Sequence, residues 1–313
     1  MKPTVYLVRA LPGDPFEALG DAVQVRGGAA QPLARDALVA AAREAEVLVP
    51  TYLDRVDAEL LAALPRVRLV ASYGVGLDHL DLAACKARGV LVTNTPGILT
   101  DATAEHALAL LLAAARRVAE GDRTVRRGGW TVADPRWMLG TAVTGKTLGI
   151  VGFGRIGQSL ARKAHGLELR VLYAHPRVVD LPGARRVELE ELLAASDFVS
   201  LNCPLTPSTR NLLSRSRIAG MRPGAVLVNT ARGAVVDDEA LAEALASGRL
   251  QAAALDVFRD EPRVPAAYLT LENVILTPHL GSGTRETRAA MGRMVAEEVL
   301  RFARGEPPAH PVR

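Results

Sequence analysis

Two groups of residues in this sequence have the types and the spacing to do chemistry. The first is a glycine loop that directly follows the apolar stretch 148–151 and directly precedes a helical pattern. In such a loop the first glycine allows a tight turn, the second lets the backbone approach a pyrophosphate, and the third lets a helix pack closely on a strand. We expect a dinucleotide here rather than a bland glycine turn, with contacts from Gly152, Gly154, Arg155, Ile156 and Gly157.

The second group is Arg232, Glu261 and His279, which stand near the carboxyl ends of three successive predicted strands. Open parallel sheets bind ligands at these ends. A guanidinium can hold the carboxylate of a 2-keto acid and polarise its ketone, and an imidazole can protonate the oxygen as hydride arrives. A neighbouring carboxylate orients that imidazole and favours its protonated form, a role that suits Glu261. Taken alone, a histidine after a strand is structural more often than catalytic.

The end of the second strand of the nucleotide domain separates NAD from NADP, because a carboxylate there accepts the ribose hydroxyls of NAD. This sequence has His175 at that position and Arg177 two residues later. Neither side chain repels a 2′-phosphate, and a guanidinium can bind one. We expect a preference for NADP(H) over NAD(H). The alternative is that Arg177 is a surface arginine and both cofactors serve.

Alternating strands and helices must position these residues. Short β-branched runs alternate with alanine-rich stretches through the first third, and a second strand–helix series starts at Lys146. This alternation predicts an α/β fold of two Rossmann-like or flavodoxin-like domains with parallel sheets. Long helices predicted over Thr100–Val118 and Arg285–Arg304 would connect them. The dinucleotide-binding domain, 100–284, is therefore expected to be inserted into a discontinuous substrate domain, 1–99 plus 285–313.

Composition limits the function classes. The chain has 313 residues, 49% of them hydrophobic, and its N-terminal segment has the pattern of a charged strand instead of a signal peptide. We expect a cytosolic protein. Cys85 and Cys203 have no partner pattern for a disulfide or zinc, so no metal site is expected. The net charge of +4 is spread among acidic residues, which predicts no nucleic-acid partner. The basic stretch Arg116–Arg127 is expected to be solvated surface, with a site rim or a dimer contact as the alternative.

The order of motifs resembles the D-isomer-specific 2-hydroxyacid dehydrogenases, most closely their glyoxylate and hydroxypyruvate reductase branch. The resemblance covers essentially the whole chain. It is carried by YGVGLDHLD, TNTPGILTDATAEHALALLL, GGWT, VGFGRIGQ, LTPSTRNL, NTARGAVVDDEAL, ALDVF with its DEP, and TPHLGSGT. The segments ILTDATAE, GGWT and PRW favour this branch over lactate, phosphoglycerate or formate dehydrogenases.

The resemblance implies roles for individual residues. It assigns catalysis to Arg232, Glu261 and His279, and it places the substrate against Arg232, His279 and the backbone amides of Val75 and Gly76. It implies that Asp256 accepts from the nicotinamide carboxamide, although a buried helix-capping role is a rival. Thr103 is implied to lie near the nicotinamide end, but it could be only a helix residue. Cofactor contacts are implied at Thr103, Cys203, Pro204, Thr230, Ala231, Asp256 and Gly281.

The expected function is a homodimeric reductase that converts glyoxylate to glycolate, and hydroxypyruvate to D-glycerate, with NADPH. Closure around hinges near residues 99 and 284 would exclude water. Tyr52, Leu53 and Leu99 are candidates for lining a small substrate pocket. Trp130 and Trp137 are expected to anchor a dimer, or else to pack beneath their loop.

Two alternatives stay open. One is another 2-keto acid substrate, such as the keto forms of D-lactate or phosphoglycerate. The other is a dinucleotide-sensing binding protein, because the C-terminal binding protein corepressors share this fold and its catalytic residues. No membrane partner is expected in any of these cases.

Overall fold

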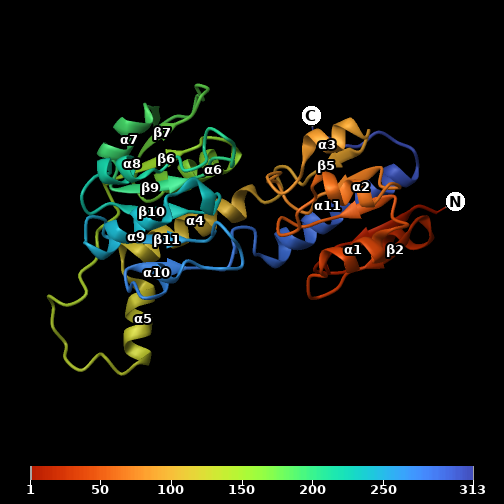
Figure 1. Ribbon diagram of the computed structural model, residues 1–313. Coiled ribbons are helices and arrows are strands. Elements are labelled where there is room, and N and C mark those ends of the chain that lie inside the picture. The colour runs from red at the N-terminus through yellow and green to blue at the C-terminus, as the bar shows by residue number, and fades with distance from the viewer. Residues whose placement is uncertain (1, 313) are drawn as a thin grey trace. The chain divides into compact units, whose positions relative to one another are not determined.

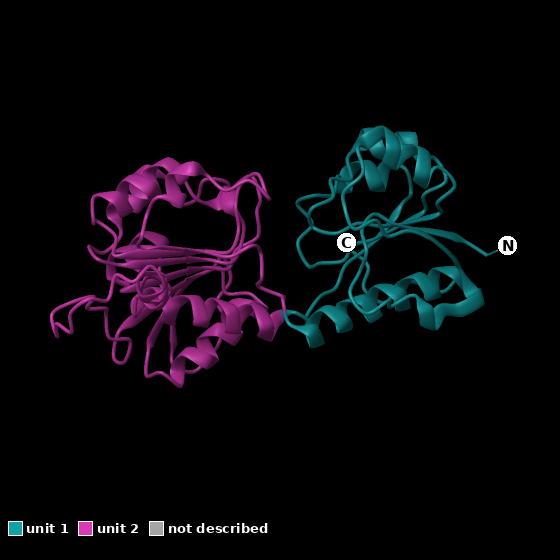
Figure 2. Cartoon of the chain, turned by 90° about the horizontal axis from the view of Figure 1, so that it is seen from below, with its two compact units in different colours: residues 1–99, 284–313 teal, residues 100–283 magenta. Residues whose placement is uncertain are grey.

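The computed structural model describes residues 2–312 and divides into two compact units. The first unit comprises residues 1–99 and 284–313, and the second comprises residues 100–283 (Figure 2). Each unit is built around one sheet of parallel strands, as the α/β prediction requires.

The first unit contains a five-stranded sheet in the order β2-β1-β3-β4-β5. The strands are β1 (Thr4–Leu7), β2 (Gln24–Gly27), β3 (Val47–Val49), β4 (Leu69–Ala71) and β5 (Leu91–Thr93). The helices are η1 (Glu17–Ala22), α1 (Arg35–Ala42), α2 (Ala58–Ala63), α3 (Leu82–Ala87) and α11 (Arg285–Ala303). The expected strands all form, whereas the edge strand β2 carries no apolar pattern, and all four of its residues are exposed.

Helix α11 completes the first unit from the far end of the chain. Its buried residues Met291, Val295 and Val299 pack it against β4 and η1. The carboxylate of Glu298, also buried, accepts hydrogen bonds from the backbone N–H groups of Ala309 and His310. This contact holds the tail beside the sheet.

The second unit contains a seven-stranded sheet in the order β12-β11-β10-β9-β6-β7-β8 (Figure 1). The strands are β6 (Thr147–Val151), β7 (Arg170–Ala174), β8 (Ala184–Arg186), β9 (Phe198–Leu201), β10 (Val226–Asn229), β11 (Ala252–Leu255) and β12 (Val274–Leu276). The helices are α4 (Thr100–Ala115), α5 (Val118–Arg126), α6 (Arg155–His165), α7 (Leu189–Ala195), α8 (Arg215–Gly220), η2 (Gly233–Val235), α9 (Asp238–Ala246) and α10 (Ala266–Leu269).

Helices cover both faces of this sheet because alternate strand residues point to opposite sides. Ile150, Phe198 and Val228 pack with α4 and α6 on one face. Val199 and Leu227 pack with α7, α8 and α9 on the other. Both faces are therefore apolar, and polar chemistry is confined to the strand ends.

The predicted helix over Thr100–Val118 is too long. Helix α4 ends at Ala115, and α5 starts at Val118 after Arg117, whose φ of 55° lies in the left-handed region. The Arg117 guanidinium makes two hydrogen bonds to the Glu120 carboxylate, at 2.8 and 2.6 Å, which hold this break. Helix α5 has no buried residue. With the loop that follows, it extends away from the sheet (Figure 1).

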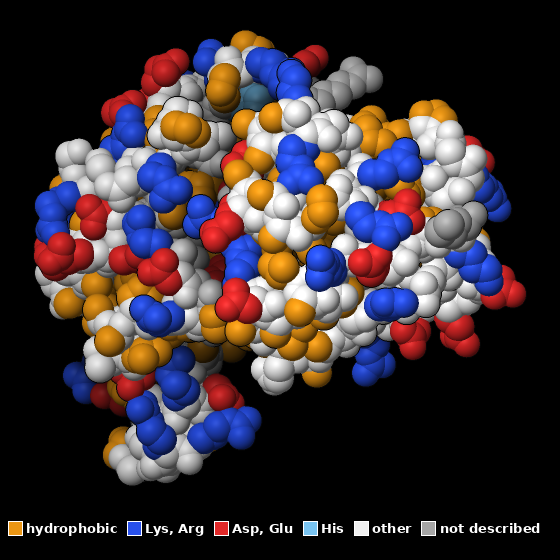
Figure 3. Space-filling model, turned by 45° about the vertical axis from the view of Figure 1, so that its right-hand side comes forward, with side chains coloured by type: hydrophobic (Ala, Val, Ile, Leu, Met, Phe, Trp, Pro, Cys, Tyr) orange, Lys and Arg blue, Asp and Glu red, His pale blue; other side chains and the backbone are white. Residues whose placement is uncertain are grey.

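Charged side chains of both signs are mixed on the surface shown in Figure 3. On the face in Figure 3, Lys and Arg side chains are interspersed with Asp and Glu and form no continuous basic area. Within residues 2–312, no helix is long and apolar enough to cross a membrane. The same part of the chain has no cluster of three His, Cys, Asp or Glu side chains able to hold a metal ion.

Close packing of α6 on β6 generates a stability prediction. A Cβ at Gly157 would lie 2.4 Å from the Gly152 carbonyl oxygen, so Gly157→Ala forces backbone apart. We expect the free energy of unfolding to fall by about 1–3 kcal/mol. Urea unfolding followed by circular dichroism measures it. Gly220→Ala, in a helix with open space at that position, is the control and should not destabilise. Equal stability of the two variants would contradict the packing argument.

Candidate active site

The carboxyl ends of the parallel strands in the second unit gather the predicted site residues at one edge of the sheet. Gly152 follows β6, His175 follows β7 and Cys203 lies just beyond β9. Thr230, Ala231 and Arg232 follow β10, Asp256 follows β11, and His279 lies just beyond β12. The structure thus brings together residues that are far apart in sequence.

His279 and Glu261 form a direct pair. The His279 Nδ1 atom lies 2.7 Å from Glu261 Oε2, and the side chains are only 18% and 15% exposed. The other oxygen of Glu261 accepts a hydrogen bond from the Phe258 N–H at 2.9 Å. Because both carboxylate oxygens are engaged, the carboxylate fixes the orientation of the imidazole ring.

Arg232 is carried by a tight turn after β10. The buried Asn229 side chain accepts from the Ala231 N–H and donates to the Arg232 carbonyl, each at 3.0 Å. A Cβ at Gly233 would lie 2.1 Å from the Phe258 carbonyl carbon, so this turn packs directly on the loop after β11. Asn229 therefore shapes the turn that presents the guanidinium.

The glycine loop has the geometry of a phosphate cradle. Gly152 has a φ of 90°, and a Cβ there would lie 2.6 Å from the backbone N of Cys203, so only glycine fits. At Gly154 nothing lies within 4 Å of an added Cβ, and this residue caps the N-terminus of α6. The loop leaves room above the helix N-terminus, where backbone N–H groups and the helix dipole favour an anion.

Unsatisfied polar atoms beside this loop also fit a dinucleotide. Among the described residues, the buried atoms Thr230 Oγ1 and Asn202 Oδ1 have no hydrogen-bond partner. They follow the adjacent strands β10 and β9. Buried polar atoms normally find partners, so both are suited to bind a polar ligand. The residues present therefore fit the cofactor.

The loop after β7 holds the two residues expected to select the cofactor. The His175 Nδ1 atom lies 3.2 Å from the Arg177 N, and Tyr173 holds the loop by donating to the Val179 carbonyl at 2.8 Å. Arg186 lies on the neighbouring edge strand β8, and its Nε donates to the His175 carbonyl at 3.0 Å. A second guanidinium, in addition to that of Arg177, thus lies at the same strand end.

Asp256 is completely buried, and its carboxylate accepts from the backbone N–H groups of Leu280 and Gly281 at 2.7 and 2.8 Å. It also accepts from the hydroxyl of Thr277 at 2.6 Å and pairs with His106 at 3.2 Å. Burial raises the pKa of Asp256, but hydrogen bonds from His106, Thr277 and Leu280 outweigh it and lower the pKa below its usual range. Asp256 is thus a buried acceptor for the loop 277–281 and, among the described residues, caps no helix, so the rival helix-capping role is not found; the carboxamide contact stays a prediction.

Other predicted cofactor residues surround this centre. Thr103 is buried on α4, and its methyl carbon would lie 3.4 Å from a Cβ added at Gly281. Burial raises the pKa of the Cys203 thiol to about 11, so this thiol is no nucleophile near neutral pH. The Pro204 carbonyl accepts from the hydroxyl of Thr209 at 2.6 Å.

The predicted substrate loop lies in the first unit, after β4. The Asn94 side chain donates to the Val75 carbonyl at 3.0 Å and so fixes this loop. Among the described hydrogen bonds, none uses the N–H of Val75 or of Gly76. Tyr52 and Leu53 follow β3 at the same edge, and Leu99 is buried at the end of the unit. Backbone N–H groups of the loop are suited to bind a carboxylate.

Sequence reasoning missed three residues that support the site. Asn94, His106 and Asn229 each hold a predicted site residue through the contacts given above. Asn94 directly follows β5 and Asn229 is the last residue of β10, and both lie inside the motifs TNTPG and NTARG, which is a usable signal. His106 also lies inside a quoted motif, TNTPGILTDATAEHALALLL, but its partner Asp256 is distant in sequence, so the motif does not show what His106 contacts.

Comparison with known proteins identifies the family. Residues 108–281 match the family model described as the D-isomer specific 2-hydroxyacid dehydrogenase, NAD binding domain. The glyoxylate reductase of Thermococcus litoralis is 43% identical over 319 residues, which cover 98% of this chain and 96% of that protein. The match to the NAD binding domain establishes a nicotinamide dinucleotide as the cofactor class.

Two solved structures support the same family assignment. The TT0316 protein of Thermus thermophilus is 44% identical with a TM-score of 0.94, covering 99% of this chain and 100% of that one. An NADPH-dependent glyoxylate/hydroxypyruvate reductase of Sinorhizobium meliloti, solved with NADP and malonate, is 29% identical with a TM-score of 0.90, covering 100% and 97%. The chain therefore belongs to the D-isomer-specific 2-hydroxyacid dehydrogenases, in their glyoxylate reductase branch, and is an oxidoreductase.

Proposed function

We propose that this protein is an NADPH-preferring reductase of small 2-keto acids that converts glyoxylate to glycolate and hydroxypyruvate to D-glycerate. The observation that carries the proposal is the His279–Glu261 pair beside Arg232 at the cofactor end of the sheet. The glyoxylate reductases among its relatives support the substrate class.

His279 is the proton donor in this proposal. Its Nδ1 faces the Glu261 carboxylate at 2.7 Å, which assigns proton donation to Nε2 on the opposite side of the ring. The carboxylate stabilises the positive charge of the imidazolium and keeps the ring in one orientation. When bound, the reduced nicotinamide supplies the hydride that reduces the ketone.

Arg232 and the loop of Val75 and Gly76 bind the substrate. A guanidinium matches the carboxylate of a 2-keto acid and polarises the adjacent carbonyl. The N–H groups of Val75 and Gly76 bind the same carboxylate from the first unit. Tyr52, Leu53 and Leu99 are the proposed walls of the pocket, whose small volume would select short substrates, and the boundaries at 99 and 284 are the proposed hinges.

The cofactor preference rests on charge at the end of β7. The groups that meet there are His175, Arg177 and Arg186, with no carboxylate at the position that binds ribose hydroxyls in NAD enzymes. A 2′-phosphate gains charge-assisted hydrogen bonds from these groups. The remaining contacts proposed for the cofactor are Thr103, Gly152, Gly154, Arg155, Ile156, Gly157, Cys203, Pro204, Thr230, Ala231, Asp256 and Gly281.

A second copy of the chain is the proposed partner of the arm formed by α5 and residues 127–140. Trp130, Val132 and Leu139 are 61%, 70% and 67% exposed on it, and Trp137 is 43% exposed, so neither indole packs beneath the loop. A nine-residue helix with no buried residue gains little stability by itself in water. Exposed apolar side chains of this kind mark interfaces.

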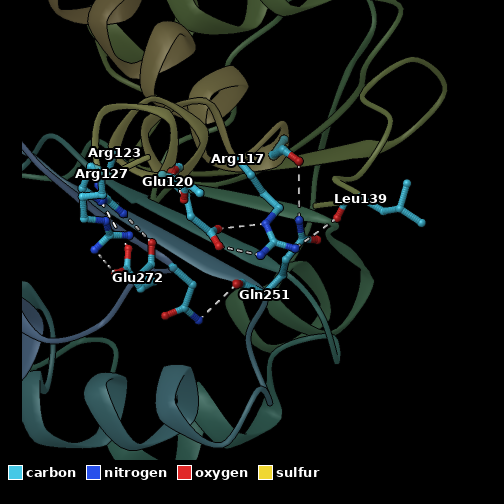
Figure 4. Close-up of polar contacts among 10 residues, drawn as sticks. Arg117, Glu120, Arg123, Arg127, Leu139, Gln251 and Glu272 are labelled. Atoms are coloured by element: carbon cyan, nitrogen blue, oxygen red, sulfur yellow. Dashed lines mark hydrogen bonds and ion pairs between the residues drawn. The ribbon is translucent and has the colours of Figure 1, made fainter. Parts of the chain in front are cut away.

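The base of the arm is held by charge. Arg123 and Arg127 bind Glu272, and Arg117 binds Glu120, beside a hollow of about 400 Å³ that Leu139 and Gln251 also line (Figure 4). Arg117, Arg123 and Arg127 of the stretch Arg116–Arg127 are thus ion-paired. We also place the enzyme in the cytosol in this proposal, since both of its buried cysteines are free thiols.

The catalytic assignment predicts the effect of His279→Gln. Loss of the proton donor should lower kcat for glyoxylate about 10²- to 10⁴-fold and leave the dissociation constant of NADPH nearly unchanged. NADPH oxidation is followed with glyoxylate, hydroxypyruvate and pyruvate, and NADPH binding by fluorescence. His165→Gln, in α6, is the matched control and should behave as the unaltered enzyme. A His279→Gln variant with a normal kcat would rule out the role of His279 as proton donor. If the unaltered enzyme reduces pyruvate but neither glyoxylate nor hydroxypyruvate, the proposed substrates are ruled out.

Charge reversal at Arg177 tests the cofactor preference. For Arg177→Glu, kcat/KM with NADPH should fall about 10- to 100-fold, since a hydrogen bond to a charged group contributes roughly 1.5–3 kcal/mol. The value with NADH should change little. Arg170→Glu, at the opposite end of β7, is the control. The preference is wrong if the unaltered enzyme has the higher kcat/KM with NADH.

Removal of both indoles tests the dimer. In Trp130→Ala/Trp137→Ala the dissociation constant of the dimer should rise about 30-fold, as expected for the loss of roughly 2 kcal/mol at an interface anchor. Sedimentation velocity over a concentration series measures it. Leu33→Ala removes an exposed side chain from the first unit and should have no effect. An unchanged dissociation constant in the double variant would exclude the arm as the interface.

A further inference from the structure

A buried carboxylate organises the loop that carries His279. Asp256 has no exposed surface, and its side chain accepts from Thr277, Leu280, Gly281 and His106. Its backbone carbonyl also accepts from the His279 N–H at 2.9 Å. Every donor except His106 belongs to the loop 277–281. The carboxylate therefore fixes the residues on both sides of the catalytic histidine.

The loop 277–281 depends on the hydrogen bonds to Asp256 because its backbone conformation is unfavourable. His279 has a φ of 55°, a left-handed conformation that costs a residue with a side chain roughly 1 kcal/mol or more. A tight bond from the Gly283 N–H to the Leu280 carbonyl, 2.6 Å, closes the turn that follows. If Leu280 and Gly281 lose their acceptor, the backbone around His279 can relax and the imidazole can leave Glu261.

His106 connects this loop to helix α4. Its Nε2 lies 3.2 Å from Asp256 Oδ1 and 3.3 Å from Thr277 Oγ1. An ionised carboxylate only accepts, so Nε2 carries the hydrogen in this contact. Thr103, one turn earlier on α4, packs against Gly281 on the other side of the carboxylate. One face of α4 thus supports the loop through these two residues.

We propose that His106 is a positioning residue for His279. It holds the Asp256 carboxylate and the Thr277 hydroxyl in place, and these hold the amides of Leu280 and Gly281, which set the backbone of His279. The described hydrogen bonds of His106 go to Asp256 and Thr277, so its proposed effect on His279 runs through this chain of hydrogen bonds. The inference rests on the proposed role of His279 as the proton donor.

The test compares His106→Leu, which removes the donor, with His106→Gln, whose side-chain N–H can replace it. In His106→Leu, kcat should fall about 10- to 100-fold, because small misplacements of a catalytic group have effects of this size. KM for glyoxylate and the dissociation constant of NADPH should change less than about threefold. His106→Gln should recover most of kcat. His165→Leu is the control for loss of an imidazole elsewhere in the same unit.

Amide hydrogen exchange supplies a readout that does not depend on activity. Exchange at Leu280 and Gly281 should be about tenfold faster in His106→Leu than in the unaltered enzyme, because their acceptor, the Asp256 carboxylate, is then less firmly held. In His106→Gln, exchange at these two amides should be slower than in His106→Leu. Thr277→Val removes the second contact of His106 together with the hydroxyl that donates to Asp256, so faster exchange in this variant tests whether the Asp256 carboxylate holds the loop of His279. Loss of activity in His279→Gln, tested separately, reports on the proposed function itself.

Four results would overturn the inference. One is unchanged exchange in the loop, and another is faster exchange with normal kcat. The third is a loss of NADPH affinity at normal kcat, which would mean that His106 acts on the cofactor through Asp256 instead of on His279. A His106→Gln variant as slow as His106→Leu would likewise show that the hydrogen bond is not what matters.

Discussion

Parallel pairing of the strands in the second unit is the constraint on which the site depends. Parallel strands present all their carboxyl ends at one edge, so every loop that leaves β6, β7, β9, β10, β11 and β12 starts from the same rim. Both faces of the sheet are covered by helices, which leaves this rim as the place where polar side chains can gather. The loops are then shaped by bonds made within the rim.

Short polar side chains do that shaping, and they act mostly on backbone. Asn229 bonds both sides of the turn that carries Arg232, and Asp256 bonds the loop of His279. In the first unit, Asn94 bonds the loop of Val75 in the same way. Each such group is buried or partly buried, where an unpaired amide or carboxylate would be costly. The loops therefore have little freedom, and the reactive side chains have their directions fixed before a ligand arrives.

The sequence allowed much of this to be predicted, because glycine spacing and strand-end motifs are local signals. The fold class, the helix after the glycine loop and the placement of Arg232, Glu261 and His279 at strand ends followed from them. The edge strands β2 and β8 were missed because their residues are largely polar and exposed. The break at Arg117 depends on a left-handed residue that no composition pattern marks. His106 was missed because its partners, Asp256 and Thr277, meet it only through the fold.

Helix α11 gives the first unit an order of assembly. A ribosome makes β1 to β5 first and α11 only after all of residues 100–283. Until then, the apolar surface that Met291, Val295 and Val299 will cover is open to water. A nascent chain of this kind carries uncovered hydrophobic surface for most of its synthesis, which is a condition under which chaperones bind and aggregation competes with folding. Premature termination directly after Gly283 leaves a complete second unit joined to a first unit without its covering helix.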